Sequence, residues 1–192
     1  MYQRYQTHCR GQERWIATRN KWHAVRHFAL LNMEVSLPEG TSLLKDDVHS
    51  WAKSFHNVMR SEIGRQIFTK FLETEYSDEN MMFWNACEDL KKEESYAKRR
   101  NMARDIYEMF IGPSAPLEVN LDGRVKTDLM KRLSSNRNDR NMFSGAQDCI
   151  FMLMERDCYR RFTRSKVYRD FVANVDASAA ARLATVQAAK KK

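Results

Sequence analysis

The fold of this chain is decided at Glu75-Tyr-Ser-Asp-Glu-Asn-Met-Met-Phe-Trp-Asn-Ala-Cys-Glu-Asp89, where a polar segment leads into an apolar helix. In the polar half, Ser77 can accept from the unpaired N–H groups of a helix start, and Asp78 and Glu79 suit the positive end of its dipole. In the second half an apolar stripe recurs at helical spacing, at Phe83, Trp84, Cys87 and Leu90. The stretch therefore predicts a helix whose apolar stripe is buried and whose polar first turn forms a rigid contact surface. An ordinary capped helix without a binding role is the alternative.

Helix-spaced apolar residues also dominate the rest of the chain. Glycine and proline are scarce, at 6 and 3 residues, and the alternation typical of β-strands is hard to find. Each further helix that we expect follows a residue that can cap a helix start: 63–72 after Ser61, 102–110 after Ser95, 125–133 after Asp122, 146–154 after Ser144, and a short final helix at 168–172 after Ser165. Between 157 and 162 the periodicity falters, which indicates a kink or a join between helices. The chain is therefore predicted to be all-α.

Charge divides the chain into a near-neutral domain and two basic flanks. The formal net charge is +8, of which residues 1–46 and 176–192 contribute +3 each and residues 47–175 only +2. We therefore expect one folded domain at 47–175, a basic N-terminal segment at 1–46, and an Ala/Lys-rich tail at 176–192 that is frayed or helical without a fixed packing partner. The near-balanced domain argues against a broad phosphate-binding face for nucleic acid, and a local basic patch is the alternative.

The N-terminal flank combines basic and aromatic residues. Trp15, Trp22, Val25 and Ala29 share one helical stripe within residues 12–31, interspersed with arginine and lysine. A basic amphipathic helix with tryptophans suits an anionic membrane surface. A helix that packs on the domain and a disordered arm are the alternatives.

The sequence contains no catalytic or metal-binding motif that we recognise. It has no Gly-rich phosphate loop and no nucleophile elbow, and His23 and His27, one helical turn apart, lack a third ligand at matching spacing. The four cysteines form no Cys-x-x-Cys pair, so we expect reduced thiols. We find no membrane-spanning run and no signal peptide, which predicts a cytoplasmic protein. The residues alone thus predict a helical interaction domain that uses no cofactor or metal.

Several separated motifs follow one another in a defined order along the domain. They are Trp51-Ala-x-Ser-Phe55, Phe71-Leu-x-x-Glu-Tyr-Ser-x-Glu-Asn80, Phe83-Trp-x-x-Cys-Glu88, Ile106-Tyr107, Glu118-Val-Asn-Leu-Asp122, Phe143-x-x-Ala-Gln147 and Leu153-Met-Glu-Arg-Asp-x-Tyr-x-Arg-Phe162. In this order they resemble the regulator of G-protein signalling (RGS) domain over roughly residues 48–173. The short architecture looks like the small, single-domain members of that family.

The resemblance implies a bundle of about nine helices, with a central four-helix bundle and a subdomain formed by the terminal helices. It also implies a GTPase-activating protein that holds the switch regions of a GTP-bound Gα subunit in the transition state, has no active site of its own and so terminates signalling. The expected partner is an inhibitory-class or q-class Gα subunit, at the inner face of the plasma membrane. The alternative is an RGS-fold scaffold without this activity, against which the retained Asn80, Asn120 and Asp157 argue.

The resemblance also implies a contact surface for Gα in three parts. The first part consists of Glu75, Tyr76, Ser77, Glu79 and Asn80. The second is Asn120, whose amide can donate and accept at once and so restrain the partner's catalytic glutamine and switch region. The third consists of Leu153, Asp157, Cys158 and Arg161. For Arg161, a rim charge without contact is the alternative.

Two residues depart from the family pattern, and two cysteines are candidates for acylation. Cys158 and Gly123 stand where serines are usual, and a thiol is the weaker hydrogen-bonding group. Cys87 matches a cysteine that is acylated in some members, although its stripe predicts burial, and Cys9 lies in the N-terminal flank. Under either interpretation we expect Phe83, Trp84 and Phe162 in the core.

Overall fold

The structure is a computed structural model that describes residues 41–134 and 139–189. In these ranges every regular element is helical, which confirms the all-α prediction. The elements are α2 (Thr41–Ser50), α3 (Phe55–Arg60), α4 (Glu62–Thr74), α5 (Glu79–Lys92), α6 (Tyr96–Phe110), α7 (Gly123–Ser134), α8 (Ser144–Leu153), the π-helical turn η1 (Met154–Cys158), α9 (Tyr159–Phe162) and α10 (Lys166–Ala189). The amphipathic segment expected at 12–31, together with Cys9, lies outside the described residues.

The predicted capping residues lie at the starts of four helices. Their side-chain oxygens accept backbone N–H bonds from the first turn: Ser61 at 3.2 Å in α4, Ser95 at 3.4 Å in α6, Asp122 at 2.7 Å in α7 and Ser165 at 3.1 Å in α10. Each bond satisfies a donor that the helix itself leaves unpaired. Local sequence therefore determines where these helices begin.

Two predicted caps are wrong. Ser144 already belongs to α8, whose N-cap position is taken by Phe143 without a side-chain capping bond. Helix α5 begins at Glu79 with Asp78 in the N-cap position, and Asp78 makes no side-chain capping bond. Ser77 lies one residue too early, and its own N–H is taken by the carbonyl of Leu72 at the end of α4 (3.0 Å). Ser77 thus completes the preceding helix instead of capping the following one.

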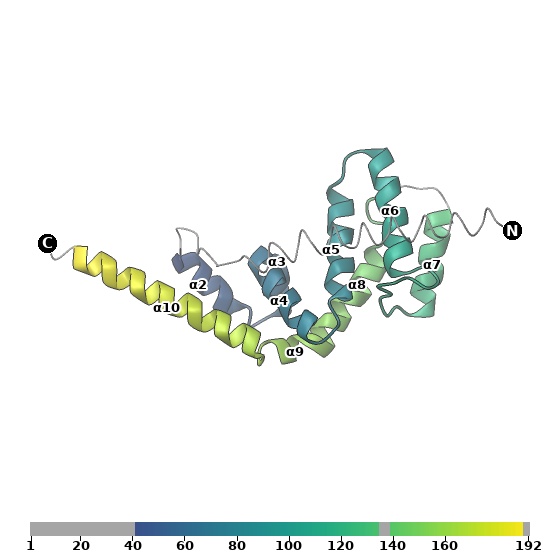
Figure 1. Cartoon of the computed structure of the whole chain (residues 1–192). Coiled ribbons are helices and arrows are strands. Elements are labelled where there is room, and N and C mark those ends of the chain that lie inside the picture. Colours follow the sequence, from purple (N-terminus) through teal and green to yellow (C-terminus); the bar gives the residue numbers. More distant parts are fainter. Residues whose placement is uncertain (1–40, 135–138, 190–192) are drawn as a thin grey trace. The chain divides into compact units, whose positions relative to one another are not determined.

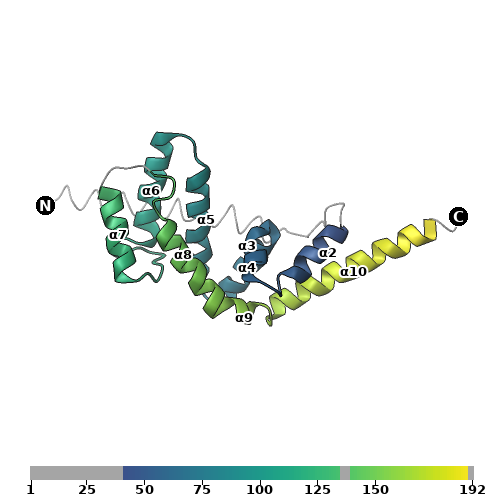
Figure 2. The ribbon, with the colours of Figure 1, turned by 180° about the vertical axis from the view of Figure 1, so that it is seen from behind.

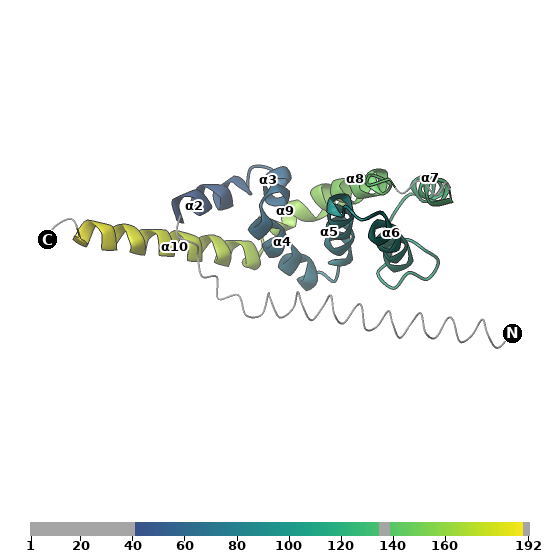
Figure 3. The ribbon, with the colours of Figure 1, turned by 90° about the horizontal axis from the view of Figure 1, so that it is seen from above.

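Two groups of helices make up the described part of the chain, as Figures 1, 2 and 3 show from three directions. Helix α5 packs against α6 and α8, and α7 packs against α8, which gives the expected four-helix bundle. Helix α2 lies along α10, which also contacts α4, while α3 packs on α4. The terminal helices therefore form a subdomain, and α4 connects it to α5. None of the described helices is both long and apolar enough to cross a bilayer.

Each group has its own aromatic core. In the bundle, the buried ring of Phe83 lies 5.7 Å from Phe110 and 6.4 Å from Phe143. In the subdomain, the fully buried Phe162 lies 5.1 Å from Phe68 and 5.7 Å from Phe71. Each buried phenylalanine contributes about 1.5–3 kcal/mol of transfer free energy. The contacts of Phe162 with Phe68 and Phe71 hold α9 against α4, the helix that leads into the polar segment 75–80.

Two further expectations about packing need correction. Helix α10 is not a short helix ending near residue 172 but runs to Ala189, because its alanines are strong helix formers. It crosses the expected domain boundary at 175 without interruption, and Asp176 pairs with Lys45 and His49 of α2.

Trp84 is half-buried and does not lie in the core as expected, and the guanidinium of Arg65 lies 6.0 Å from the centre of its ring. The predicted join near 157–162 is confirmed as η1 between α8 and α9.

Candidate functional site: a polar surface across the α4–α5 turn and α9

The turn between α4 and α5 has the hydrogen bonds of a Schellman motif. Ser77 N–H donates to the carbonyl of Leu72 at 3.0 Å, and Tyr76 N–H donates to that of Glu73 at 3.3 Å. The motif places Tyr76 in the left-handed region, at φ 54°, where glycine is usual. The Tyr76 side chain is 94% exposed, so packing within the described residues does not explain the strain. A strained, exposed aromatic residue is typical of a binding surface.

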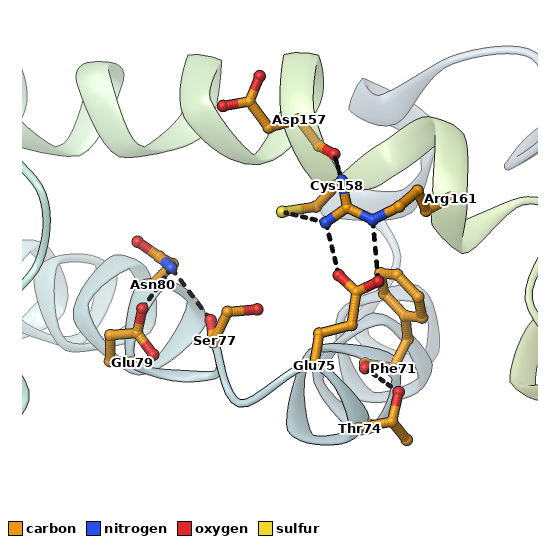
Figure 4. Close-up of polar contacts among 9 residues, drawn as sticks. All are labelled: Phe71, Thr74, Glu75, Ser77, Glu79, Asn80, Asp157, Cys158 and Arg161. Atoms are coloured by element: carbon orange, nitrogen blue, oxygen red, sulfur yellow. Dashed lines mark hydrogen bonds and ion pairs between the residues drawn. The ribbon is translucent and has the colours of Figure 1, made fainter.

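Asn80 supports this turn from within α5. It is only 4% exposed, and its Nδ2 donates to the carbonyl of Ser77 at 3.0 Å and to Oε1 of Glu79 at 2.7 Å (Figure 4). Its Oδ1 and the Oγ of Ser77 are buried and have no hydrogen-bond partner among the described residues. Burial raises the pKa of Glu79 above its ordinary value. The segment 75–80 thus contains two buried oxygens without a hydrogen-bond partner among the described residues.

The guanidinium of Arg161 in α9 joins this turn to the third predicted contact set. Its Nε and Nη2 donate to the two carboxylate oxygens of Glu75, at 2.9 and 2.6 Å (Figure 4). This hydrogen bond is the main reason why the pKa of Glu75 lies below its ordinary value. Bidentate pairing fixes orientation as well as distance. The structure therefore brings together two contact sets that lie 86 residues apart in the sequence.

The third set lies on η1 and the ends of the helices beside it. Leu153 is half-buried, whereas Asp157 is exposed and pairs with Arg156 at 2.9 Å, a hydrogen bond that lowers the pKa of its carboxyl. Cys158 is 6% exposed, and burial raises the pKa of its thiol. π-helical turns insert one residue into a helix and often mark functional sites. Here η1 leaves Asp157 exposed while the next side chain, Cys158, is buried.

Asn120 lies in a separate loop, between α6 and α7. It is exposed, and its neighbours Val119 and Leu121 are buried at 1% and 6% exposure. Val119 N–H donates to the carbonyl of Phe110 at 2.9 Å, which returns the loop to the end of α6. No hydrogen bond or ion pair among the described residues connects Asn120 to the α4–α5 turn or to η1. The loop therefore presents Asn120 independently of the other two sets.

The structure buries the described acylation candidate. Cys87 is 1% exposed on α5, and burial raises the pKa of its thiol far above the ordinary value. Its position fits a core residue, and acylation would require local opening of the helix. Across residues 41–134 and 139–189, no group of three or more histidine, cysteine, aspartate and glutamate side chains is arranged to hold a metal ion.

Sequence reasoning missed the polar connection between α5 and α8. Gln147 is 3% exposed, and its Nε2 donates to the carbonyl of Trp84 at 3.1 Å and to Oε1 of Glu88 at 2.9 Å. Burial would raise the pKa of Glu88, but hydrogen bonds from Lys91 and Gln147 outweigh it and lower that pKa. The signal was a glutamine on the apolar stripe of α8. This connection fixes the helix that carries Asn80 against the helix that leads into η1.

Comparisons with known proteins identify the family of this chain. Residues 54–171, more than half of the chain, match the family described as "Regulator of G protein signaling domain". The chain is 44% identical to "Regulator of G-protein signaling rgs-1" of Caenorhabditis elegans over 127 residues, which are 66% of this chain and 62% of that protein. It is 42% identical to "Regulator of G-protein signaling 20" of Bos taurus over 134 residues, 70% of this chain and 35% of that protein.

A further relative aligns over more of the chain. Identity to "Regulator of G-protein signaling 20" of Gallus gallus is 37% over 166 residues, which cover 86% of this chain and 73% of that protein. The chain thus spans between about a third and three quarters of the length of these relatives, and less than two thirds of the bovine and nematode proteins. By its matched domain, its helical bundle and these relatives, the chain belongs to the regulator of G protein signaling domain family.

Proposed function

We propose that this protein is a GTPase-activating protein for heterotrimeric Gα subunits. The observation that carries the proposal is the surface of the α4–α5 turn, which presents Tyr76, strained at φ 54° and 94% exposed. A partner can reach the exposed ring of Tyr76 directly, and aromatic side chains that become buried at an interface contribute strongly to binding. Membership of the RGS family supports a Gα subunit as this partner.

The proposed mechanism is differential binding. The described residues suggest a surface of fixed side chains around which mobile segments of a partner can be ordered. If those segments fit the surface better in the transition state than in the ground state, hydrolysis by the partner accelerates without any catalytic residue from this protein. Asn120 can donate and accept hydrogen bonds from an exposed position, so we assign it to restrain the partner's catalytic glutamine.

Single-turnover GTP hydrolysis by purified inhibitory-class and q-class Gα subunits tests this function. We expect the protein to accelerate hydrolysis by at least one class, and Asn120→Ala to reduce that acceleration about 10- to 100-fold, as expected for loss of a hydrogen bond worth about 1.5–3 kcal/mol. The fold should be unaffected, because the Asn120 side chain is exposed. If the folded protein accelerates neither class, the scaffold alternative replaces this proposal.

We further infer that the N-terminal segment brings the protein to the inner face of the plasma membrane. The inference rests on the tryptophans and basic residues of 12–31. Deleting residues 1–40 should greatly weaken binding to vesicles that contain anionic lipid, as measured by co-sedimentation, while activity toward Gα in solution is retained. Vesicle binding of unchanged strength after the deletion would refute the inference.

A further inference from the structure

The guanidinium of Arg161 forms its hydrogen bonds with other residues of this chain. Besides its two bonds to Glu75, it donates from Nη1 to the main-chain carbonyl of Asp157, and its Nη2 lies 3.9 Å from Sγ of Cys158 (Figure 4). All three guanidinium nitrogens therefore have partners in this chain. Although its side chain is 56% exposed, Arg161 has few N–H groups left to donate to another protein.

The carboxylate that Arg161 holds lies at the start of the strained turn. Glu75 is the C-cap residue of α4 and directly precedes Tyr76. Its side chain is 25% exposed, less than half the value for Arg161. Because both carboxylate oxygens are bound, the orientation of Glu75 is fixed from α9, 86 residues further along the chain.

Other contacts between α4 and α9 do not reach the turn. The rings of Phe71 and Phe162 lie 5.7 Å apart, but Phe71 lies one helical turn before Glu75. Among the hydrogen bonds and ion pairs of the described residues, only the Glu75–Arg161 pair connects segment 75–80 to segment 153–161. The turn that contains Tyr76 is therefore attached to α9 through this pair. Tyr76 itself has a backbone conformation that L-residues disfavour.

We propose that Arg161 is a positioning residue: through Glu75 it holds the turn that carries Tyr76 in its binding conformation before the partner arrives. The proposal rests on the proposed function and revises the sequence-based expectation that Arg161 contacts Gα. A turn that is ordered in advance loses less conformational entropy on association. Loss of Arg161 should therefore raise the KM for GTP-bound Gα and leave kcat nearly unchanged. Lysine should not substitute, because it cannot bind both carboxylate oxygens in a planar fork.

Amide hydrogen exchange tests the positioning role without any partner. The N–H groups of Tyr76 and Ser77 are bonded in the turn, so their exchange reports its opening. In Arg161→Ala and Arg161→Lys we expect exchange at these two amides to be about two- to fivefold faster, the size expected for an exposed ion pair. The unfolding midpoint should fall by no more than a few degrees. The matched control is Arg160→Ala, which removes the same charge from the neighbouring exposed position. Unchanged exchange in Arg161→Ala would overturn the proposal.

A double-mutant cycle in the activation assay separates positioning from direct contact. If Arg161 acts through Glu75, Arg161→Ala raises KM in the wild-type background but has a much smaller effect in the Glu75→Gln background, where the amide can accept at most one of the two hydrogen bonds. Equal effects in both backgrounds would show that Arg161 contacts the partner itself and would overturn the proposal. If the wild-type protein accelerates no Gα subunit, the proposed function fails, and the exchange result alone upholds or overturns the positioning role.

Discussion

The α4–α5 turn and the α6–α7 loop present polar residues by opposite means. The turn, residues 75–80, is held by hydrogen bonds of Asn80 and by the Glu75–Arg161 ion pair, and it places Tyr76 at positive φ. The loop, residues 111–122, is held by Val119 and Leu121, which are buried on either side of the exposed Asn120. Polar restraints thus shape the first region, and apolar burial shapes the second.

This difference determines what each region tolerates. In the turn, a change of charge or hydrogen-bonding pattern should alter both the fold and the surface, because the same groups serve both. In the loop, the exposed residue can change without loss of the two apolar anchors. The same substitution made in both regions therefore separates the two ways of positioning a contact residue.

The largest expected difference comes from replacing each asparagine with aspartate. Asn80→Asp places a buried carboxylate against the carbonyl of Ser77 and the carboxylate of Glu79, where Nδ2 now donates. We expect it to lower the free energy of unfolding by about 3 kcal/mol at pH 7. Asn120→Asp, at an exposed position, should change it by less than about 0.5 kcal/mol. Urea unfolding monitored by circular dichroism measures both.

The pH dependence gives a second check on the buried variant. Burial disfavours the charged carboxylate, so in Asn80→Asp the folded state binds a proton at higher pH than the unfolded state does. Its stability relative to wild type should therefore rise as the pH falls from 7 toward about 4. A deficit that does not depend on pH, or equal losses in the two variants, would contradict the contrast between turn and loop.

A smaller effect of opposite sign is expected at the two residues with positive φ. Tyr76, at φ 54°, lies in the turn, and Ser114, at φ 60°, lies in the loop between α6 and α7. Glycine relieves the strain at either position and should stabilise the protein by up to about 1 kcal/mol, after its larger unfolded-state entropy is counted. Only Tyr76→Gly should also weaken activation of Gα, because it removes the exposed ring.

Thermal unfolding and the activation assay together check this pair. If Tyr76→Gly is more stable than wild type and less active, the strain at this turn is a cost retained for binding. If Ser114→Gly loses activity to the same extent, the two regions do not differ in the way that we describe.

Local rules were sufficient for much of the fold. Ser61, Ser95, Asp122 and Ser165 begin helices as predicted, because a cap depends only on the residues of the next turn. The faltering periodicity near 157–162 likewise indicated the π-helical join. Burial of Phe83 followed from its position on an apolar stripe, although Trp84 on the same stripe is only half-buried. The helical fold could therefore be predicted from local sequence, whereas the bundle architecture and the family were implied by the resemblance of the ordered motifs to the RGS domain.

The geometry of the candidate site could not be predicted, because it depends on contacts between distant segments. Serine is a common N-cap residue, but the N–H of Ser77 donates to the carbonyl of Leu72 in the Schellman motif that ends α4. The pairing of Glu75 with Arg161 spans 86 residues, and no local pattern indicates it. The positive φ of Tyr76 could not be predicted either, because glycine is the residue that usually indicates this conformation and the position holds tyrosine. Tertiary structure determined each of these features.

The measurement that tests the central claim most directly is the affinity of this protein for one Gα subunit in two states. Isothermal titration calorimetry can compare Gα bound to a non-hydrolysable GTP analogue with Gα bound to GDP and aluminium fluoride, which mimics the transition state. We predict at least about tenfold tighter binding to the transition-state form, because only differential binding accelerates hydrolysis. Equal affinity for the two forms would contradict the account and favour a scaffold that binds Gα without activating it.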